Sequence, residues 1–310
     1  MTGDDSAFQQ IVSLVAPGAT IVRQWSLGGG ISCSMTALEL ESHEAKHERL
    51  VVREVGKWSF ENYPNSVRNE YELLIYLRDC GIPVASPRHF DLSCKLMARP
   101  FLVLDYVEGS PDLAVDDRTQ RVRIMAENLA KIHSVDVAHP ALAYVKPTPI
   151  NIRLVGDQLD DELQEGKIRS VLESFIGHVA ENRYTFRHGD FWPGNMVWKD
   201  ERLAAVIDWE ETSIGDPLFD VAIARLDLLW AYGEEAMITF THAYQAKVDL
   251  DYTFLPWWDL RVSLRPMLNI GAWATSFPLL GRPDVTSDSM TCGHRWFVDS
   301  AIDQLRHSKG

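Results

Sequence analysis

The chain lacks the features of a secreted, disulfide-bonded or membrane protein. Four of its 310 residues are cysteines, and they are scattered without a C-x-x-C pair. This usage predicts reduced thiols in a cytosolic protein rather than a disulfide or zinc framework. The first residues are acidic and do not form a signal peptide, and no apolar run is long enough to cross a bilayer. We therefore expect a cytoplasmic protein that does not interact with membranes.

An excess of positive charge is missing as well. The chain has 30 Lys and Arg residues against 44 Asp and Glu residues, which gives a net charge of -14. A nucleic-acid-binding protein needs a basic surface, so we expect no nucleic-acid partner. What is present is an ordinary globular composition, 46% hydrophobic and 24% charged, over a length that allows two lobes. The oligomeric state stays open.

The pattern of apolar residues changes character near residue 108. Before that point it predicts a helix at 6–15, strands near 21–27, 34–40, 50–55 and 100–107, and a helix at 66–80. The sequence E-G-S-P at 108–111 then breaks the pattern. Beyond it, helical spacing dominates, near 116–133, 160–179, 217–247, 255–276 and 288–306. The sequence therefore predicts an α+β protein with an N-terminal lobe at 1–107 and a C-terminal lobe at 108–310.

The stretch R-H-G-D-F-W-P-G-N at 187–195, followed by V-I-D-W-E at 206–210, carries the clearest chemical signal. Asp190 and Asn195 are separated by Pro193 and Gly194, which favour a tight loop over a helix. Asp208 follows a short apolar run that is typical of a buried strand. Carboxylate and amide oxygens are ligands for hard cations such as Mg²⁺. The pattern indicates a metal–phosphate centre built from a loop and a strand end.

Several motifs occur together in one order. H-G-D-x-x-P-G-N is followed by I-D-W-E and by G-D-P-x-x-D at 215–220, after a glycine turn, a strand with a cation and a helix with a carboxylate. This order resembles the aminoglycoside phosphotransferase and choline-kinase-like family, which are small-molecule relatives of the protein kinases. The resemblance implies a bilobal, protein-kinase-like fold. Its small N-terminal lobe, an antiparallel sheet, would bind the nucleotide, and its larger, mainly helical C-terminal lobe would bind the acceptor and catalyse transfer.

The resemblance also implies roles for the loop residues. Asp190 corresponds to the catalytic base that orients the acceptor hydroxyl, and Asn195 and Asp208 correspond to the Mg²⁺ ligands. Phosphoryl transfer from ATP depends mainly on positioning and charge stabilisation, which these groups supply. His188 and Asp220 are expected to be structural. We therefore expect ATP and Mg²⁺ as cofactors.

The family pattern places the phosphate-binding groups in the N-terminal lobe. Arg53 stands where the family has a Lys or Arg and would contact the α- and β-phosphates. Glu70 would hold it by an ion pair, with Glu72 as the competing partner. The glycine turn would let the backbone approach phosphates, although it could equally be a plain hairpin turn; it consists of Gly28, Gly29 and Gly30.

The strand at 100–107 resembles the hinge of the kinases. The backbone C=O of Asp105 and N–H of Val107 would pair with adenine, and Leu104 would line the pocket behind it. Because backbone recognition constrains side chains little, a plain core strand is the competing interpretation.

Trp192 departs from the family, where His is frequent, and leaves the loop without a neighbouring cation at that position. The acceptor is expected beside this loop. Aromatic and acidic residues further on would suit a cationic or amphipathic hydroxyl compound, or would be core. They are Trp230, Tyr232, Trp257, Trp258, Trp273, Trp296, Glu210, Glu211, Asp227 and Asp259.

Three functions are compatible with these motifs. The first is an ATP-dependent phosphotransferase that acts on a hydroxyl of an aminoglycoside-like compound, an amino alcohol, a macrolide or another metabolite. The second is a nucleotide-binding pseudokinase scaffold, suggested by Arg53 and Trp192. The third, a metal-dependent phosphohydrolase, lacks the His-rich ligands of a dinuclear site.

Overall fold

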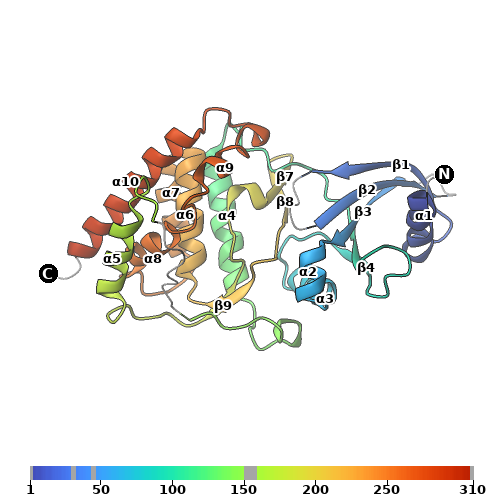
Figure 1. Cartoon of the computed structure of the whole chain (residues 1–310), viewed down its shortest axis with the longest axis horizontal. Coiled ribbons are helices and arrows are strands. Elements are labelled where there is room, and N and C mark those ends of the chain that lie inside the picture. The colour runs from blue at the N-terminus through green and yellow to red at the C-terminus, as the bar shows by residue number, and fades with distance from the viewer. Residues whose placement is uncertain (1–2, 29–32, 43–46, 150–158, 308–310) are drawn as a thin grey trace. The chain divides into compact units, whose positions relative to one another are not determined.

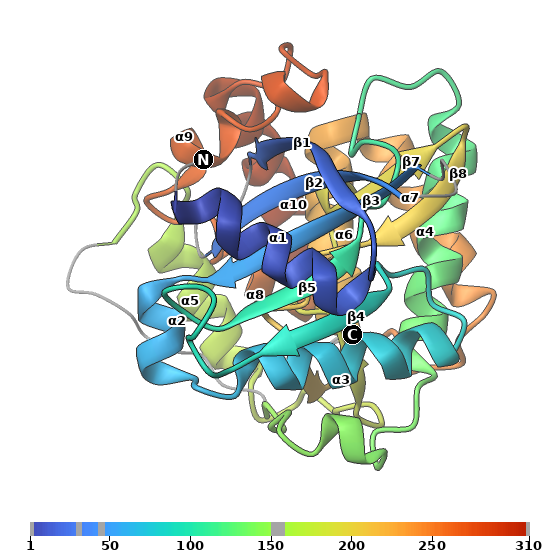
Figure 2. The ribbon, with the colours of Figure 1, turned by 90° about the vertical axis from the view of Figure 1, so that its right-hand side faces the viewer.

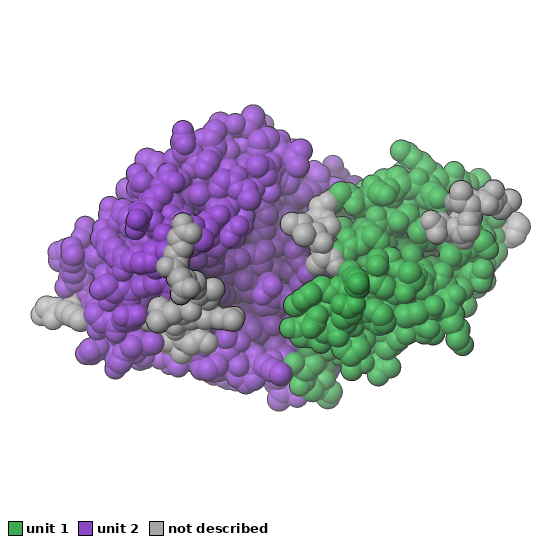
Figure 3. All heavy atoms as spheres, in the orientation of Figure 1, with its two compact units in different colours: residues 1–108, 140–144 green, residues 109–139, 145–310 purple. Residues whose placement is uncertain are grey.

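The computed structural model describes residues 3–28, 33–42, 47–149 and 159–307 (Figure 1). The chain forms two compact units, coloured separately in Figure 3. Unit 1 contains Met1–Glu108 and Pro140–Tyr144, and unit 2 contains Gly109–His139 and Val145–Gly310. Each unit is described by itself below.

Unit 1 is built on a five-stranded antiparallel sheet with the strand order β1-β2-β3-β5-β4. The strands are β1 (Thr20–Leu27), β2 (Cys33–Glu41), β3 (His47–Val55), β4 (Pro87–Asp91) and β5 (Phe101–Asp105). Three helices and one turn of 3₁₀ helix complete the unit: α1 (Gly3–Val15), α2 (Lys57–Asn62), α3 (Ser66–Asp79) and η1 (Pro140–Leu142). Strands β2 and β3 pair along their whole length, from Cys33 opposite Val55 to Glu41 opposite His47.

One face of this sheet packs against α1 (Figure 2). The core there joins apolar side chains of α1 to alternate residues of the strands, among them Ile11, Leu38, Leu50, Val52 and Phe101. Successive side chains of a strand point to opposite faces. The alternation in β3 therefore turns Arg53 to the face away from α1.

Unit 2 is mainly helical. Its helices are α4 (Arg118–His133), α5 (Glu165–Phe175), α6 (Leu218–Tyr232), α7 (Glu234–Gln245), α8 (Leu255–Val262), α9 (Ile270–Ala274) and α10 (Ser287–His307), with 3₁₀ turns η2 (Pro193–Asn195) and η3 (Pro278–Leu280). Two short antiparallel pairs accompany them: β6 (Thr185–Arg187) with β9 (Ser213–Gly215), and β7 (Met196–Lys199) with β8 (Arg202–Val206). Helix α6 is buried on nearly every face and contacts α7, α8 and α10, so it forms the centre of the unit (Figure 1).

Two of the long helices predicted from the sequence are interrupted. The stretch 217–247 breaks at Gly233, whose φ of 89° lies outside the helical region. The stretch 255–276 stops at Val262, and a run of turns that contains Pro266 leads to α9. Leu268 in that run has a φ of 60°. Apolar spacing continued through both breaks, which is why periodicity alone did not locate them. In the part of the chain that is described, no helix is long and apolar enough to cross a membrane.

Candidate active site

The loop Arg187–Asn195, called the catalytic loop below, connects β6 to β7 in unit 2. Its path depends on Gly189, which has a φ of 86°. A Cβ atom there would lie 2.0 Å from the carbonyl oxygen of Glu211, so a larger residue would clash with backbone. Glycine is therefore required for this turn.

Asp220 of α6 braces the loop from beneath. Its carboxylate accepts hydrogen bonds from the backbone N–H groups of His188, at 2.7 Å, and Gly189, at 3.0 Å. It also contacts the ring of His133 on α4 at 3.3 Å, and the other ring nitrogen of His133 lies 2.6 Å from the hydroxyl of Tyr244. All of these groups are buried. The contacts with His133 and His188 lower the pKa of Asp220 against the effect of burial.

The ring of His188 is completely engaged in holding backbone. Its Nε2 lies 3.0 Å from the carbonyl oxygen of Ile207, and its Nδ1 accepts from the N–H of Asp190 at 3.2 Å. Burial lowers the pKa of His188, so the ring is neutral. These contacts give His188 a structural role.

The catalytic loop brings Asp190 and Asn195 into direct contact. The side-chain Nδ2 of Asn195 donates to the backbone oxygen of Asp190 at 2.9 Å and to its Oδ2 at 3.1 Å. This orientation uses the amide nitrogen and leaves the amide oxygen as the acceptor end of the side chain. The backbone oxygen of Asn195 accepts from the N–H of Ile207 at 3.0 Å. Because Asp208 follows Ile207 in the chain, this hydrogen bond brings Asp208 close to Asn195.

Asp208 is held in a strained backbone conformation, with a φ of 66°. Non-glycine residues rarely adopt this region, and where they do the strain frequently marks a functional position. An amide oxygen and a carboxylate suit a hard cation that also binds phosphate oxygens. Within the described ranges no group of three or more His, Cys, Asp or Glu side chains is arranged to hold a metal ion.

Arg265, which the sequence analysis did not single out, reaches Asp190 from the turns after α8. Its Nη2 pairs with Asp190 Oδ1, and its Nη1 lies 3.9 Å from Oδ2 of Asp227 on α6. The guanidinium also lies over the ring of Trp273, 5.6 Å from the centroid. The two residues are 75 positions apart in the sequence, so no local motif could predict their pairing.

Asp227 is the buried member of this group, with 7% of its surface exposed. Burial raises its pKa to about 7; the positive charge of Arg265 opposes the rise, and the negative charge of Asp190 adds to it. A carboxyl group whose pKa lies near 7, next to a candidate base, is a feature of functional sites; ion-pair networks also produce such pKa values.

Trp192 is committed to packing within the loop. Its ring lies against Phe277, with centroids 6.1 Å apart, and folds back over Gly194. A Cβ atom on Gly194 would lie 2.2 Å from the Trp192 ring. Positive charge reaches Asp190 from another element, through its ion pair with Arg265.

In unit 1, Arg53 on β3 pairs with Glu70 on α3. Its Nε also lies 3.3 Å from Sγ of Cys33 on β2. Glu72, the competing partner, is exposed. The sheet and α3 thus present a guanidinium whose orientation is fixed by a carboxylate.

The residues expected to form a hinge lie at the end of β5 and just after it. The side chain of Leu104 is buried, and in the described chain no hydrogen-bond partner is found for the N–H of Val107. Asp105 uses its carboxylate for an ion pair with Arg88 at 2.5 Å, and its backbone N–H donates to the carbonyl oxygen of Ser86 at 2.8 Å. Of the glycine turn, Gly28 has open space around it. Gly29 and Gly30 lie outside the described residues.

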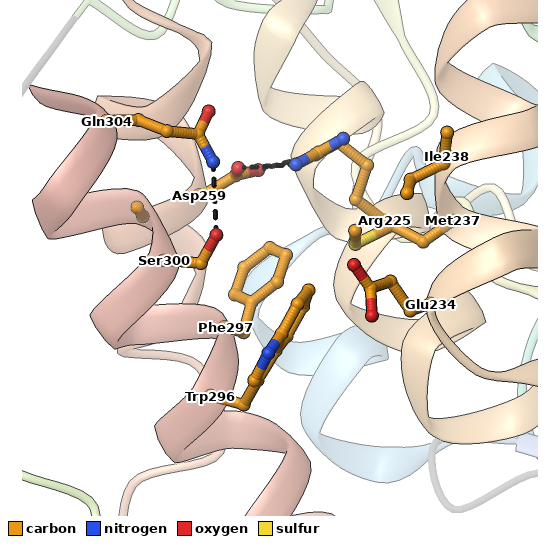
Figure 4. Close-up of a pocket in the computed structure, with 10 residues that line it drawn as sticks. Arg225, Glu234, Met237, Ile238, Asp259, Trp296, Phe297, Ser300 and Gln304 are labelled. Carbon is orange, nitrogen blue, oxygen red and sulfur yellow. Dashed lines mark hydrogen bonds and ion pairs between the residues drawn. The ribbon is translucent and has the colours of Figure 1, made fainter.

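Three of the six aromatic residues expected at the acceptor site belong to the core of unit 2. Trp230, Trp257 and Trp258 are buried. A cavity of about 200 Å³ between α6, α7, α8 and α10 is lined by Trp296 and by Arg225, which pairs with Asp259 (Figure 4). The three donating nitrogens of Arg225 are bound by Asp259 and Thr241. This cavity is partly open to solvent, and no residue of the catalytic loop lines it.

Comparisons with known proteins agree with this geometry. The model of the phosphotransferase enzyme family matches residues 42–258. The chain is 25% identical over 201 residues to acyl-CoA dehydrogenase family member 10 of Mus musculus, covering 57% of this chain but 18% of that protein. It is 25% identical over 183 residues to an aminoglycoside 3'-phosphotransferase of Niallia circulans, covering 55% of this chain and 68% of that protein.

A solved structure shows the same fold over nearly the whole length. The GDP complex of wild-type aminoglycoside 2'-phosphotransferase-IIIa superimposes with a TM-score of 0.60 at 18% identity, covering 98% of both chains. The α+β, protein-kinase-like fold expected from the motifs is thereby confirmed. The family match includes the catalytic loop, Asp208 and Arg53. The chain belongs to the phosphotransferase enzyme family.

Proposed function

We propose that this protein transfers the γ-phosphate of ATP to a hydroxyl group of a small molecule, with Asp190 as the catalytic base. The observation that carries the proposal is the joining of Asp190, Asn195 and the start of the Asp208 segment by the hydrogen bonds described above. In this arrangement the carboxylate of Asp190 would receive the acceptor next to oxygen donors that would hold a cation. Phosphoryl transfer requires this combination of positioning and charge.

Asn195, through its amide oxygen, and Asp208 would hold Mg²⁺. The ion supplies positive charge to the phosphate oxygens. In unit 1, which we propose as the nucleotide-binding unit, Arg53 held by Glu70 would bind phosphate oxygens. The glycine turn at 28–30 would cover the phosphates, and the Leu104, Asp105 and Val107 segment would receive the adenine.

Unit 2 would bind the acceptor beside Asp190. The partly exposed ring of Trp273 and the carboxyl of Asp227 lie next to the base through their contacts with Arg265. Such a surface would suit a cationic or amphipathic hydroxyl compound. The four cysteines are free, which fits the reduced cytoplasm in which ATP is available.

Incubation with Mg²⁺-ATP and a panel of aminoglycosides, macrolides, amino alcohols and sugars, with mass spectrometry of the products, tests this proposal. The wild type is expected to convert one class to a phosphate ester. Asp190→Asn is expected to lose transfer by on the order of 10²-fold or more while it keeps its melting temperature and its ATP-induced thermal shift. Asp303→Asn, an exposed change on α10, serves as the matched control. Full transfer by Asp190→Asn would remove Asp190 as the base.

The nucleotide is tested in the same way. A structural relative is known as a GDP complex, so ATP and GTP are compared by thermal shift with and without Mg²⁺. Nucleotide binding without transfer to any member of the panel would favour the pseudokinase scaffold. No binding of either nucleotide would refute the proposed function as a whole.

A further inference from the structure

Three side chains contact the guanidinium of Arg265 next to the proposed base, Asp190. Its two terminal nitrogens face the carboxylates of Asp190 and Asp227, and its planar group lies over Trp273. Trp273 is in turn packed edge-on against Trp230, whose Nε1 donates to the carbonyl oxygen of Met290 at 2.9 Å. The guanidinium therefore has a fixed direction, because a planar fork between two acceptors and an aromatic face has few other orientations.

The segment that carries Arg265 is also fixed. The carbonyl oxygen of Ser263 lies 2.8 Å from Nε2 of the buried His294 on α10. The backbone N–H of Leu268 donates to Oδ2 of Asp160 at 2.9 Å. A residue that is anchored on both sides of its position in the chain can impose geometry on its partner, whereas a residue in a loose loop would follow it.

The carboxylate of Asp190 is consequently bound at both oxygens. Oδ1 is bound by Arg265 and Oδ2 by Asn195, at 3.1 Å. Each carboxylate oxygen has two lone pairs, so one acceptor hydroxyl can still be received. The two contacts together set the rotation of the carboxylate about its own axis. Asn195 alone would leave that rotation free.

We propose that Arg265 is a positioning residue for phosphoryl transfer: it orients the carboxylate of Asp190, and Asp227 and Trp273 orient Arg265. This inference rests on the proposed role of Asp190 as the base. It assigns to a residue between α8 and α9 the charge that Trp192 does not supply within the catalytic loop. The acceptor reacts with Asp190, and Arg265 acts through that group.

The test uses Mg²⁺-ATP hydrolysis, with water as the acceptor, because this reaction needs the same base and no identified substrate. The proteins are the wild type, Asp190→Asn, Arg265→Gln, Arg265→Lys and the control Arg282→Gln. Arg282 pairs with Asp284 in the same unit and is similarly covered, and among the described residues no side-chain hydrogen bond or ion pair joins it to the catalytic loop. Melting temperature and the thermal shift with Mg²⁺-ATP establish that each variant folds and binds nucleotide.

Arg265→Gln is expected to lower kcat by on the order of 10²-fold with KM for ATP unchanged, because displacement of a reacting group costs about that much. Arg265→Lys should lie between Gln and the wild type, since a lysine restores charge but lacks the fork and the stacking on Trp273. Added guanidinium ion at a non-denaturing concentration should partly restore Arg265→Gln. Arg282→Gln should hydrolyse ATP like the wild type.

The outcomes separate the two proposals. If Asp190→Asn loses hydrolysis and Arg265→Gln keeps it, Arg265 is not a positioning residue and the proposed function stands. If Arg265→Gln raises KM for ATP at constant kcat, its role is binding and the inference is wrong. If Asp190→Asn retains hydrolysis, the base assignment fails first, and the role of Arg265 falls with it.

Discussion

Asp190 and Asp227 face the same guanidinium from different environments. Asp190 lies on the catalytic loop with 27% of its side chain exposed, whereas the side chain of Asp227 is 10% exposed. Desolvation disfavours the charged form of a carboxyl group, so the more buried of the two is the one that resists ionisation. Near neutral pH the charge that Asp227 presents to Arg265 therefore depends on pH.

This difference predicts how stability changes with pH. The pKa of Asp227 is about 7 in the folded chain, against an ordinary value of 3.8 for an aspartic acid. The folded state binds the proton of Asp227 more tightly than the unfolded chain does. The contribution of Asp227 to the free energy of unfolding is therefore fully present below pH 3.8, and it is lost as the pH rises from there through about 7. Urea unfolding of Asp227→Asn and the wild type at several pH values measures this loss. Between the two pKa values, the free energy of unfolding of the wild type should fall relative to that of Asp227→Asn by up to about 1.4 kcal/mol per pH unit.

Above the window the difference should become constant, because Asp227 is then ionised in both states. Asp303→Asn, which removes an exposed carboxylate, should show no such dependence. A pH-independent difference between wild type and Asp227→Asn would mean that this carboxyl titrates normally in the fold.

At the scale of elements, α6 unites the two halves of the site in unit 2. Asp220 and Asp227 are seven residues apart, which is two helical turns, so they lie on one face of the helix. The first braces the catalytic loop and the second faces Arg265. Arg225 lies on another face and pairs with Asp259. A rotation of α6 about its axis would therefore disturb both the loop and Arg265.

The sequence predicted the elements that carry local signals. The loop motif, the strand before Asp208 and the helix with Glu70 all appear where the residue patterns placed them. The breaks at Gly233 and after Val262 were missed because apolar spacing continues through them. Arg265 was missed for a different reason: its partners are distant in the sequence, and only tertiary packing brings them together.

The 3₁₀ turn η2 gives a test of how Trp192 shapes the catalytic loop. Gly194→Ala would place a methyl group inside the indole ring, so it should destabilise the protein while Trp192 is present. In a Trp192→Ala background the same change should cost much less. A double-mutant cycle from urea unfolding should give a coupling of about 1–3 kcal/mol. Additive effects would show that the loop backbone, rather than the ring, requires glycine at 194.

At the scale of the whole molecule, the chain is not divided at a single point. Pro140–Tyr144 belongs to unit 1 although both of its neighbours in the chain belong to unit 2. The turn η1 contacts α3, and Ala141 and Leu142 are buried. A break in composition at 108–111 could suggest a boundary. The sequence could not predict that Pro140–Tyr144, about 30 residues later, packs with unit 1, because this depends on an apolar contact between distant positions.

This return predicts that Leu142→Ala weakens unit 1. Leu142 is 1% exposed, and truncation of a buried leucine typically costs about 2–5 kcal/mol. Hydrogen exchange should become faster in α3, while the amides of α6 in unit 2 keep their protection. The exposed Leu279, changed to Ala, is the matched control and should leave both helices as they are. Faster exchange in α6 alone would contradict the grouping of η1 with α3.

The brace at Asp220 has a consequence for the newly made chain. Asp190 and Asn195 leave the ribosome about two dozen residues or more before Asp220. Tyr244, whose hydroxyl contacts the ring of His133, follows later still. At a synthesis rate of about 5–20 residues per second, the loop spends a second or more without its brace. During that interval the backbone amides of His188 and Gly189 have no carboxylate to bind. The loop Arg187–Asn195 thus gains its brace late in translation, when α6 has formed beneath it.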